Sequence, residues 1–510
     1  MRSLPARQKA RLAQPTAAIK TLSAPVGGKN SRDSKSSLME AEAIEMINLI
    51  AGRRGIMSRK GYTERTTGYS SVPETLIPYV SGATKLFLSA SGTTLYTDNG
   101  DGTLTSKATG LTNARWQGVQ LGSNLMIANG ADAPRNFDGS SVTTITFSGD
   151  ISTYGEEKIH AFHKHRNRVY AWDIGHPNFF YGGVNAVAGA FDEFPLENVS
   201  DTGGNIVEIK TISRDAGDGP DDYIAFILDT GEIIVYAGSN PSDATNWTLS
   251  GKYKAPPIVG IRCAKEIAGD VLLLTQGDLL KLTDVIKYGA EEGGLNINPS
   301  KLAGDISSDF DTYGTNYGWS LNVYPREGWI VINVPEVTGS SYHQHVVAAT
   351  GAYTTFNGWN SSVYGVLNQN LYFGSGTAVY QGDSGLSDDG AAIDLKAQQA
   401  FSVLGTPREK KVNNARLYME SEGGLTIDFS IGYDFDFLNP QGATDSDVDG
   451  AEWDVADWDV ADWAGDSARQ IPFTVAGVGT YVSPQISLSV LGQRVTWYST
   501  TFNYNVSQSY

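Results

Sequence analysis

Residues 371–383 read LYFGSGTAVYQGD and predict a β-hairpin. A β-prone run, Leu-Tyr-Phe, leads into Gly374-Ser375-Gly376, which tolerates the positive φ of a tight turn, and Ala-Val-Tyr runs back. An isolated hairpin buries too little apolar surface to be stable in water. This hairpin therefore has to stack on similar units elsewhere in the chain.

Comparable strand-turn-strand passages recur along the sequence at intervals of 39 to 58 residues. They begin at Leu86, Leu125, Val169, Ile224, Val271, Trp329 and Leu371. This spacing is close to that of four-stranded propeller blades. We therefore predict an all-β fold, a β-propeller of six or seven blades over residues 62–400. A pair of β-sandwiches is the alternative that irregular spacing leaves open.

The composition is typical of a β-rich, turn-rich protein. Of 510 residues, 57 are glycine, 10% are aromatic and 18% are charged, which is too apolar for a disordered chain. The single cysteine, Cys263, excludes an intrachain disulfide framework and is expected to be a small buried residue. The sequence contains no run of about 18 apolar residues, so it predicts no membrane span. The basic amino end lacks the apolar core of a secretory signal.

Two regions flank the predicted propeller. Residues 1–35 carry eight Lys or Arg against one acid, Asp33, and are expected to lie extended until a partner orders them. Apolar residues at helical spacing over 37–51 predict one short helix. Residues 1–61 are thus expected to form an extended basic arm plus a short helix, and residues 401–510 a β-rich region.

Short motifs follow one another in a fixed order from residue 25 to about residue 500. Those near the amino end are Pro25 to Ser34, Met39, Ala43, Asn48 and Arg59 to Gly61. Those farther along are Phe356 to Trp359, Leu371 to Gly374, Val379 to Asp383, Ser387 to Gly390, the Trp-Asp repeat at 453–463 and Val495 to Tyr498. In this order they resemble tail nozzle proteins of short-tailed bacteriophages, the tail tubular protein B type. Residues 65–350 match those proteins only in style.

The resemblance implies a structural virion protein with no enzymatic activity and no cofactor. In nozzle proteins six copies form a ring below the portal and adaptor, close the tail before infection and let DNA out on ejection. It therefore implies a homohexamer in the phage tail, assembled in the host cytoplasm, with the adaptor and tail fibres as candidate partners. Double-stranded DNA would pass through the lumen without specific binding. Arg32 and Asp33, in the basic arm, are candidate assembly residues.

The charge of the chain limits what it can bind. A formal net charge of −18 excludes a generic DNA-binding protein, because such a body repels a polyanion. Tight phosphate contacts would hold DNA in place, whereas a wall that repels phosphate leaves a duplex free to slide. The acidity is therefore compatible with a conduit.

The strongest metal-binding signal lies in an acidic stretch near the carboxyl end. Asp445, Asp447, Asp449 and Gly450 stand as at the start of a calcium loop. The loop then departs from the pattern, because Ala456 occupies the position of the closing bidentate Glu. The three aspartates are thus candidate calcium ligands, and a turn rich in Asp and Gly that needs no ion is the alternative.

Three tryptophans, Trp453, Trp458 and Trp463, recur every five residues in the same stretch. A period of five fits neither a strand nor a helix, so the three rings cannot line one regular face. Short arcs that each stack one Trp on a neighbour would fit the spacing. The repeat predicts either a subunit contact or a local core plug.

Other chemistry-bearing residues give weaker signals. His160, His163 and His165 lack the converging ligands of a zinc site, because on a strand the last two share a face and the first points away. We interpret them as part of a solvated basic edge strand. Gly374-Ser375-Gly376 is a hairpin turn and no nucleophile elbow, and no Walker-type phosphate loop occurs.

Two further classes of function use a propeller. A glycan-binding module of a phage tail would stack sugars on exposed aromatic rings, for which Trp247, Trp319 and Trp359 are the candidates. A glycosidase would need two carboxylates about 5 to 10 Å apart across a pocket. No motif in the sequence indicates such a pair.

Overall fold

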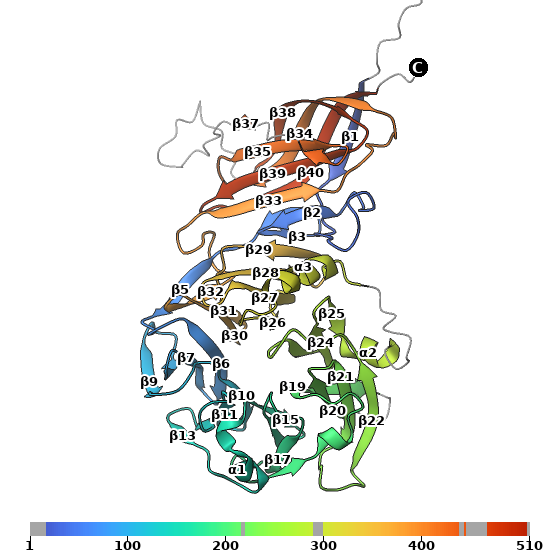
Figure 1. Ribbon diagram of the computed structural model, residues 1–510. Helices are drawn as coiled ribbons and strands as arrows, with labels where there is room; N and C mark the ends of the chain where they lie inside the picture. Colours follow the sequence, from blue (N-terminus) through green and yellow to red (C-terminus); the bar gives the residue numbers. More distant parts are fainter. Residues whose placement is uncertain (1–16, 216–219, 289–298, 438–442, 445–466, 507–510) are drawn as a thin grey trace, which may run out of the picture. The chain divides into compact units, whose positions relative to one another are not determined.

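The computed structural model describes residues 17–215, 220–288, 299–437, 443–444 and 467–506 (Figure 1). The chain forms two compact units. The propeller unit comprises residues 59–393 together with 29–33. The second unit comprises residues 394–510 together with 1–28 and 34–58.

The described residues of the propeller unit form seven groups of paired strands, six with four or more strands and one with three. The first has β6 (Pro73–Ser81), β7 (Thr84–Ser91), β8 (Thr94–Asp98) and β9 (Leu104–Ala108). The second has β10 (Gln117–Leu121), β11 (Asn124–Ala128), β12 (Arg135–Phe137) and β13 (Val142–Thr144). The third has β14 (Phe147–Ser148), β15 (Ala161–His165), β16 (Arg168–Trp172), β17 (Phe179–Val184) and β18 (Gly189–Phe194). The fourth has β19 (Ile206–Asp215), β20 (Pro220–Leu228), β21 (Glu232–Gly238) and β22 (Trp247–Lys254), and the fifth has β23 (Ala264–Ile267), β24 (Asp270–Leu274) and β25 (Leu279–Lys281). The sixth has β26 (Ser320–Tyr324), β27 (Trp329–Val337), β28 (Ser341–Val347) and β29 (Tyr353–Phe356). The seventh has β30 (Val363–Leu367), β31 (Asn370–Ser375) and β32 (Ala378–Gly382), together with β5 (Tyr62–Thr67).

The sheets are arranged as blades around a common centre (Figure 1). The innermost strands β6, β10, β15, β19, β23, β26 and β30 contact one another in that order, and β30 returns to β6. The predicted β-propeller is therefore confirmed, and each of the seven repeat starts falls in the second strand of one sheet. Second strands such as β11, β24 and β31 are buried along almost their whole length, because neighbouring blades cover both faces.

The amino-terminal strand β5 closes the ring by pairing antiparallel with β32. The predicted hairpin at 371–380 is confirmed, since β31 and β32 are adjacent and antiparallel, with Ser375 opposite Ala378. Gly376 takes φ +56° in the turn between them. The described strands of each blade pair antiparallel, with one exception: the two-residue strand β14 joins the outer strand β18 in parallel.

The described residues include three α-helices, α1 (Asp150–Tyr154), α2 (Leu282–Tyr288) and α3 (Ala303–Tyr313), and two 3₁₀ turns, η1 (Glu156–Lys158) and η2 (Leu196–Asn198). Helix α3 buries Ile306 in the core that Trp319, Ile332 and Tyr353 also form. Among the described residues, no helix combines the length and the apolar character needed to cross a membrane.

The second unit contains two antiparallel groups of strands. One has β1 (Ala17–Ser23), β3 (Leu49–Ala51), β4 (Ile56–Ser58), β34 (Lys410–Ser421), β38 (Ser467–Gly479) and β40 (Val495–Val506). The other has β2 (Ala43–Ile47), β33 (Ile393–Gln399), β35 (Thr426–Tyr433), β36 (Asp436–Phe437), β37 (Ala443–Thr444) and β39 (Val482–Val490). The rings of Phe429 on β35 and Phe473 on β38 lie 4.7 Å apart, so side chains of the two groups meet in a shared core.

The predicted helix over 37–51 is wrong. Strands β2 and β3 occupy its second half, and Asn48 between them has φ +57°. Ile44, Ile47 and Ile50 are β-branched and suit a strand better than a helix. The partner strand β33 then satisfies the backbone of β2, so long-range pairing outweighs the helical spacing of the apolar residues.

The expected separate arm over 1–61 is also wrong for its described part. Strand β1 pairs with β40 over its whole length, and β2 to β4 belong to the same unit as the carboxyl end of the chain. Residues 29–33 instead belong to the propeller unit, whose continuous part begins at residue 59 and ends at residue 393. The chain itself orders residues 17–33, because exposed strand edges of its own sheets need backbone partners.

Candidate functional site

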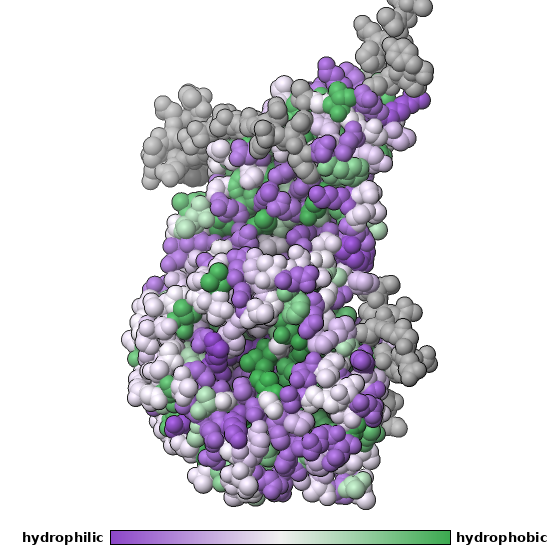
Figure 2. Space-filling model, viewed as in Figure 1, coloured by the Kyte–Doolittle hydropathy of each residue, from purple (hydrophilic) through white to green (hydrophobic). Residues whose placement is uncertain are grey.

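A central channel runs between the innermost strands of the propeller. Its cavity has a volume of about 220 Å³. Every blade contributes to the lining, through Thr75 to Ile77, Gln117, Gly118, Ala161, Phe162, Glu208, Lys210, Ala264, Lys265, Ser320 to Asn322, Val363 and Tyr364. This volume lies below the roughly 300 Å³ at which pockets for small organic ligands begin. On the face seen in Figure 2, hydrophobic residues gather at the centre of the ring.

The charged residues of the channel form a compact network. The Glu208 side chain is buried, accepting the backbone N–H of Arg262 at 2.8 Å and the Lys210 ammonium at 2.6 Å. The Arg262 guanidinium donates to the carbonyl oxygens of Glu74 and Trp116, at 3.0 and 3.2 Å, and so ties three blades together. Burial inside the channel and the charge of Lys210 lower the pKa of Lys265. Glu208 is the one carboxylate among the described lining residues, so the channel lacks the carboxylate pair of a glycosidase.

A buried ion pair fastens the ring closure. The Arg59 guanidinium donates to both carboxylate oxygens of Asp388, at 2.7 and 2.6 Å, and to the Asn357 carbonyl at 2.9 Å. Its carbon lies 5.5 Å from the centre of the Phe356 ring and 5.4 Å from that of Trp359. Three motifs that carry the resemblance, at 59–61, 356–359 and 387–390, thus meet at one place in the fold.

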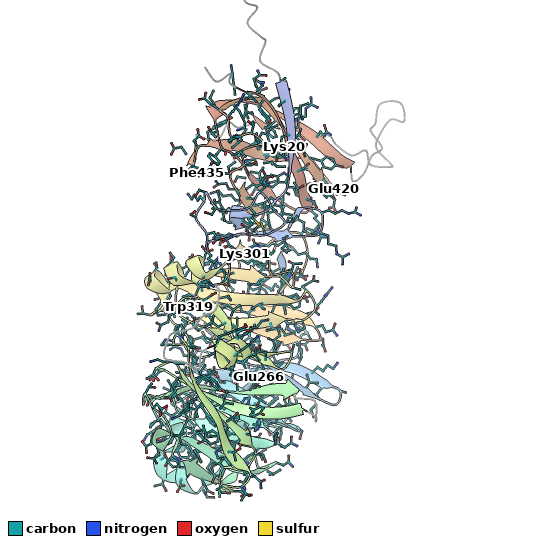
Figure 3. All side chains as sticks on the ribbon, turned by 90° about the vertical axis from the view of Figure 1, so that its right-hand side faces the viewer. Lys20, Glu266, Lys301, Trp319, Glu420 and Phe435 are labelled. Carbon is teal, nitrogen blue, oxygen red and sulfur yellow. The ribbon has the colours of Figure 1, made fainter. Side chains whose placement is uncertain are left out.

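Residues 29–33 dock on the amino end of α3, which has no capping side chain of its own. The Ser31 hydroxyl accepts the backbone N–H of Asp305 at 2.9 Å, in the first turn of α3. It also accepts the Tyr353 hydroxyl at 2.9 Å and donates to the carbonyl of Lys301 at 3.1 Å, the residue labelled beside the helix in Figure 3. The Lys29 ammonium lies 2.5 Å from the Asp305 carboxylate. This long-range cap fixes the segment to the propeller unit.

The candidate assembly residues Arg32 and Asp33 pair with each other. The Arg32 guanidinium donates to Asp33 at 2.9 and 2.7 Å and to the Pro299 carbonyl at 2.9 Å. Hydrogen bonds from Arg32 and from the Asn30 amide lower the pKa of Asp33 to about 2. Both side chains are about one-third exposed, so they remain accessible to a partner while holding the turn of the segment.

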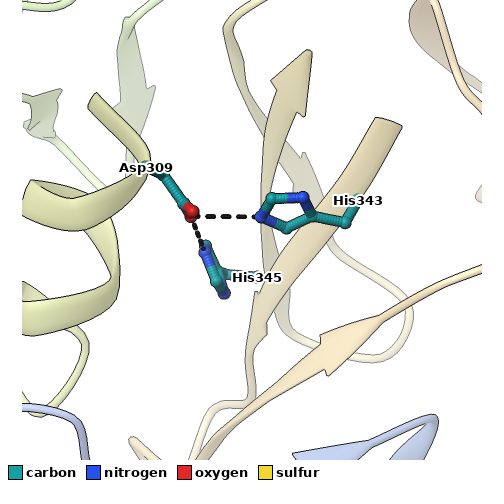
Figure 4. Close-up of side chains that lie close together, drawn as sticks. All are labelled: Asp309, His343 and His345. Carbon is teal, nitrogen blue, oxygen red and sulfur yellow. Dashed lines mark hydrogen bonds and ion pairs between the residues drawn. The ribbon is translucent and has the colours of Figure 1, made fainter. Parts of the chain in front are cut away.

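Helix α3 also carries one member of a cluster that can hold a metal ion (Figure 4). Asp309 Oδ2 lies 3.1 Å from Nε2 of His343 and 2.7 Å from Nε2 of His345, both on β28. Burial would raise the pKa of Asp309, but hydrogen bonds from the two histidines hold it below its usual range. Burial lowers the pKa of His345, whereas for His343 the hydrogen bonds and charges of Asp309 and Glu336 outweigh burial and raise it.

The histidine cluster was missed by sequence reasoning. The signal that could have found it is His343-Gln344-His345 on a predicted strand, where alternate residues share a face. Asp309 lies 34 residues earlier on a helix, and nothing in the sequence pattern joins it to them.

No protein-family profile matches the chain, and no curated protein is similar to it in sequence. Its structure is similar to that of a streptogramin B lyase, with a TM-score of 0.39 and 8% identity, over 64% of this chain and 96% of that chain. It is also similar to the computationally designed Ika8 protein, with a TM-score of 0.38 and 10% identity, over 63% and 99% of the two chains. YCF48 from Cyanidioschyzon merolae gives a TM-score of 0.40 and 11% identity, over 63% and 98%. At these values the propeller assignment rests on the strand pairing, and nothing about function follows.

The edge position predicted for the strand of His163 and His165 is confirmed, because β15 is the last strand of its sheet, but the predicted solvation is wrong. Strand β15 is the innermost strand of its blade, and His165 is 1% exposed. His163 and His165 share a face, as expected, since both rings hydrogen-bond the Thr211 hydroxyl, at 2.9 and 3.0 Å. His160 instead bonds Asp173 at 3.0 Å. Burial lowers the pKa of His165 to about 4, so the ring is neutral at pH 7.

The tryptophans named for glycan stacking are buried, so a sugar cannot reach their rings. Trp247, Trp319 and Trp359 are 6%, 5% and 0% exposed and belong to the cores between blades.

Cys263 is fully buried, as expected, and burial raises the pKa of its thiol, which removes it as a nucleophile at neutral pH. The candidate calcium ligands Asp445, Asp447 and Asp449 and the repeat of Trp453, Trp458 and Trp463 lie outside the described residues.

Proposed function

We propose that the chain is a structural subunit of a phage tail nozzle. Six copies form a ring below the portal and adaptor, close the DNA conduit before infection and let the genome out on ejection. The protein acts in the tail of the virion, with the adaptor and the tail fibres as partners, and has no enzymatic activity. DNA passes through its lumen without being held.

The observation that carries this proposal is the meeting of the resembling motifs at the ring closure. Arg59 and Asp388 are 329 residues apart in the sequence and form a bidentate ion pair beside Trp359. Motifs that hold a ring closed are needed by any protein that shares the architecture. Their presence in the same order as in nozzle proteins supports a common design.

The charge and the channel support a conduit formed between subunits. A net charge of −18 disfavours a stable complex with phosphate, which suits a wall along which DNA must slide. The channel of one propeller, at about 220 Å³, is far too small for a duplex. A DNA path in such a protein therefore has to run between copies of the chain.

The chemistry of the described residues also favours a structural role. Glu208 in the channel is occupied by Lys210 and by the backbone of Arg262, and Cys263 is buried with a raised pKa. The described residues of the channel thus offer neither a free carboxylate pair nor an activated thiol. No observation favours the glycan-binding alternative, because its candidate tryptophans are buried.

The proposal is tested by assembling phage particles without this chain. We expect heads that package DNA but lose it, because the conduit below the adaptor stays open, and addition of the purified chain should restore retention. Particles without the chain that keep their DNA and infect normally would contradict the proposal. A purified chain that hydrolyses glycans or nucleic acid would contradict it as well.

A further inference from the structure

Three side chains with metal-binding atoms converge between α3 and β28. The ligand atoms of Asp309, His343 and His345 all lie within 4.8 Å of one another, and this is the only such group of three among the residues that the structure describes. Ligands of a four-coordinate ion about 2.0–2.2 Å from its nitrogens and oxygens are themselves a little over 3 Å apart. The 3.1 Å and 2.7 Å separations from Asp309 therefore need only a slight widening to admit an ion.

Both histidines are oriented for this role by a partner at the other ring nitrogen. Nδ1 of His343 lies 2.9 Å from Oε1 of Glu336, and Nδ1 of His345 lies 3.4 Å from the Thr355 hydroxyl. The Nε2 atoms thus face Asp309 together, and each Nδ1 has an oxygen beside it that can accept a hydrogen bond when the metal-binding tautomer carries its proton there. A metal-bound histidine characteristically donates its second N–H to such an outer group, which fixes the ring and its tautomer.

The surrounding charges favour a divalent cation. Asp309 and Glu336 both face the histidines. Asp305, 3.9 Å from the ring of His345, is already paired with the Lys29 ammonium. Lys29 therefore neutralises Asp305, and the two remaining carboxylates, Asp309 and Glu336, balance the charge of one divalent ion.

We propose that Asp309, His343 and His345 bind a divalent transition-metal ion, with Zn²⁺ as the best match. Two imidazole nitrogens and one carboxylate oxygen form a set that suits zinc and its neighbours better than the all-oxygen sites of Ca²⁺ and Mg²⁺. The side chains of His343 and Asp309 are 12% and 17% exposed, which leaves an open direction for a water as fourth ligand. The His345 side chain is 3% exposed and therefore almost fully buried.

The ion would act as a structural link. Helix α3 lies between the β23–β25 sheet and the β26–β29 sheet in the sequence and, among the described strands, contacts β27 most extensively. A metal bond from Asp309 to two residues of β28 would fasten the helix to the middle of its blade. The same helix carries the docking site of residues 29–33, so the link also stabilises the surface on which Ser31 and Lys29 are held.

The proposal is tested by titrating the full-length chain, freed of metal with a chelator, with Co²⁺ and Zn²⁺. We expect one Co²⁺ per chain, with the visible absorption of a four-coordinate ion, displaced by Zn²⁺. Asp309→Asn and His345→Asn should each weaken binding more than about tenfold, and Glu336→Gln by about tenfold through the lost outer contact. Zn²⁺ should also raise the Tm of the wild type and leave that of His345→Asn unchanged.

His176→Asn is the matched control, because His176 is also paired with a carboxylate, Glu193 at 2.8 Å, but belongs to no group of three metal-binding side chains among the described residues. It should bind as the wild type does. A wild-type chain that binds no ion would overturn the proposal, as would equal loss of binding in His176→Asn and His345→Asn. Glu336→Gln serves as a variant that is expected to fold, because the Glu336 side chain is 37% exposed. An unchanged metal affinity in a folded Glu336→Gln variant would also count against the site.

Discussion

The guanidinium of Arg59 and the carboxylate of Asp388 face each other in a two-pronged ion pair, with side chains 0% and 9% exposed. Arg59 precedes the strand that closes the propeller, and Asp388 follows the strand on which it closes. The pair therefore joins the two ends of the ring. Removing one partner would leave the other charge buried without compensation.

Arg59→Met should destabilise the propeller by about 3–5 kcal/mol, because it leaves the Asp388 carboxylate buried and unpaired. Arg326→Met is the control, since Arg326 pairs at 3.8 Å with Glu327 and both are exposed, and it should cost less than about 1 kcal/mol. Urea unfolding measures the stability of the two variants, and hydrogen exchange of β5 and β32 measures how often the ring opens in each. Equal stability of the two variants would show that the ion pair does not hold the ring.

Gly61→Ala should destabilise the same closure by about 1–3 kcal/mol. A Cβ at this position would stand 1.7 Å from the carbonyl oxygen of Ser387, a backbone atom that cannot turn aside. Gly277→Ala has open space around its Cβ and should change stability by less than about 1 kcal/mol. Thermal unfolding of the two variants compares them, and a tolerated Gly61→Ala would contradict the close approach of these segments.

Ser31→Ala should loosen the amino end of α3 and the docked segment together, at a cost of about 0.5–2 kcal/mol. The hydroxyl is the acceptor for Asp305 N–H and for Tyr353, and α3 has no cap of its own. Ser36→Ala, at an exposed serine nearby, should have little effect. Limited proteolysis after Lys29 and Arg32 measures the release, and equal cleavage of the two variants would argue against the cap.

His165 should make the propeller less stable in acid. Its pKa is about 4 in the folded chain and about 6.5 when unfolded, so the unfolded state binds more protons between these values. The contribution is fully present above pH 6.5 and falls by about 3 kcal/mol as the pH drops to 4. His165→Gln should flatten this part of the pH profile in urea unfolding. Lys164→Gln, at its exposed neighbour, should leave the slope unchanged, and a parallel profile for His165→Gln would contradict the argument.

Local patterns predicted the parts of the fold that depend on neighbouring residues. The hairpin at 371–380, the seven repeat starts and the shared face of His163 and His165 follow from strand period and turn chemistry. The helix predicted over 37–51 is wrong because apolar residues at this spacing also fit two short strands. Pairing of β2 with the partner strand β33 decides in favour of the strands. Sequence spacing contains no information about that partner.

The sites escaped prediction for a related reason. Asp309 reaches the histidines of β28 only because α3 packs beside that blade, and Ser31 caps a helix 274 residues away from it in the chain. Arg59 and Asp388 were each visible as parts of motifs, but their pairing depends on ring closure. Contacts of this kind arise from topology, which the order of motifs indicates only in outline.

We propose that six copies of this chain surround the DNA path of a phage tail. An electron-microscopy reconstruction of the virion tail without imposed symmetry tests it most directly. We expect six copies of the propeller around the tail axis, with the duplex running between them and outside each propeller's own channel. Virions that lack the chain, or that carry it in any arrangement other than a six-fold ring around the DNA, would contradict the account.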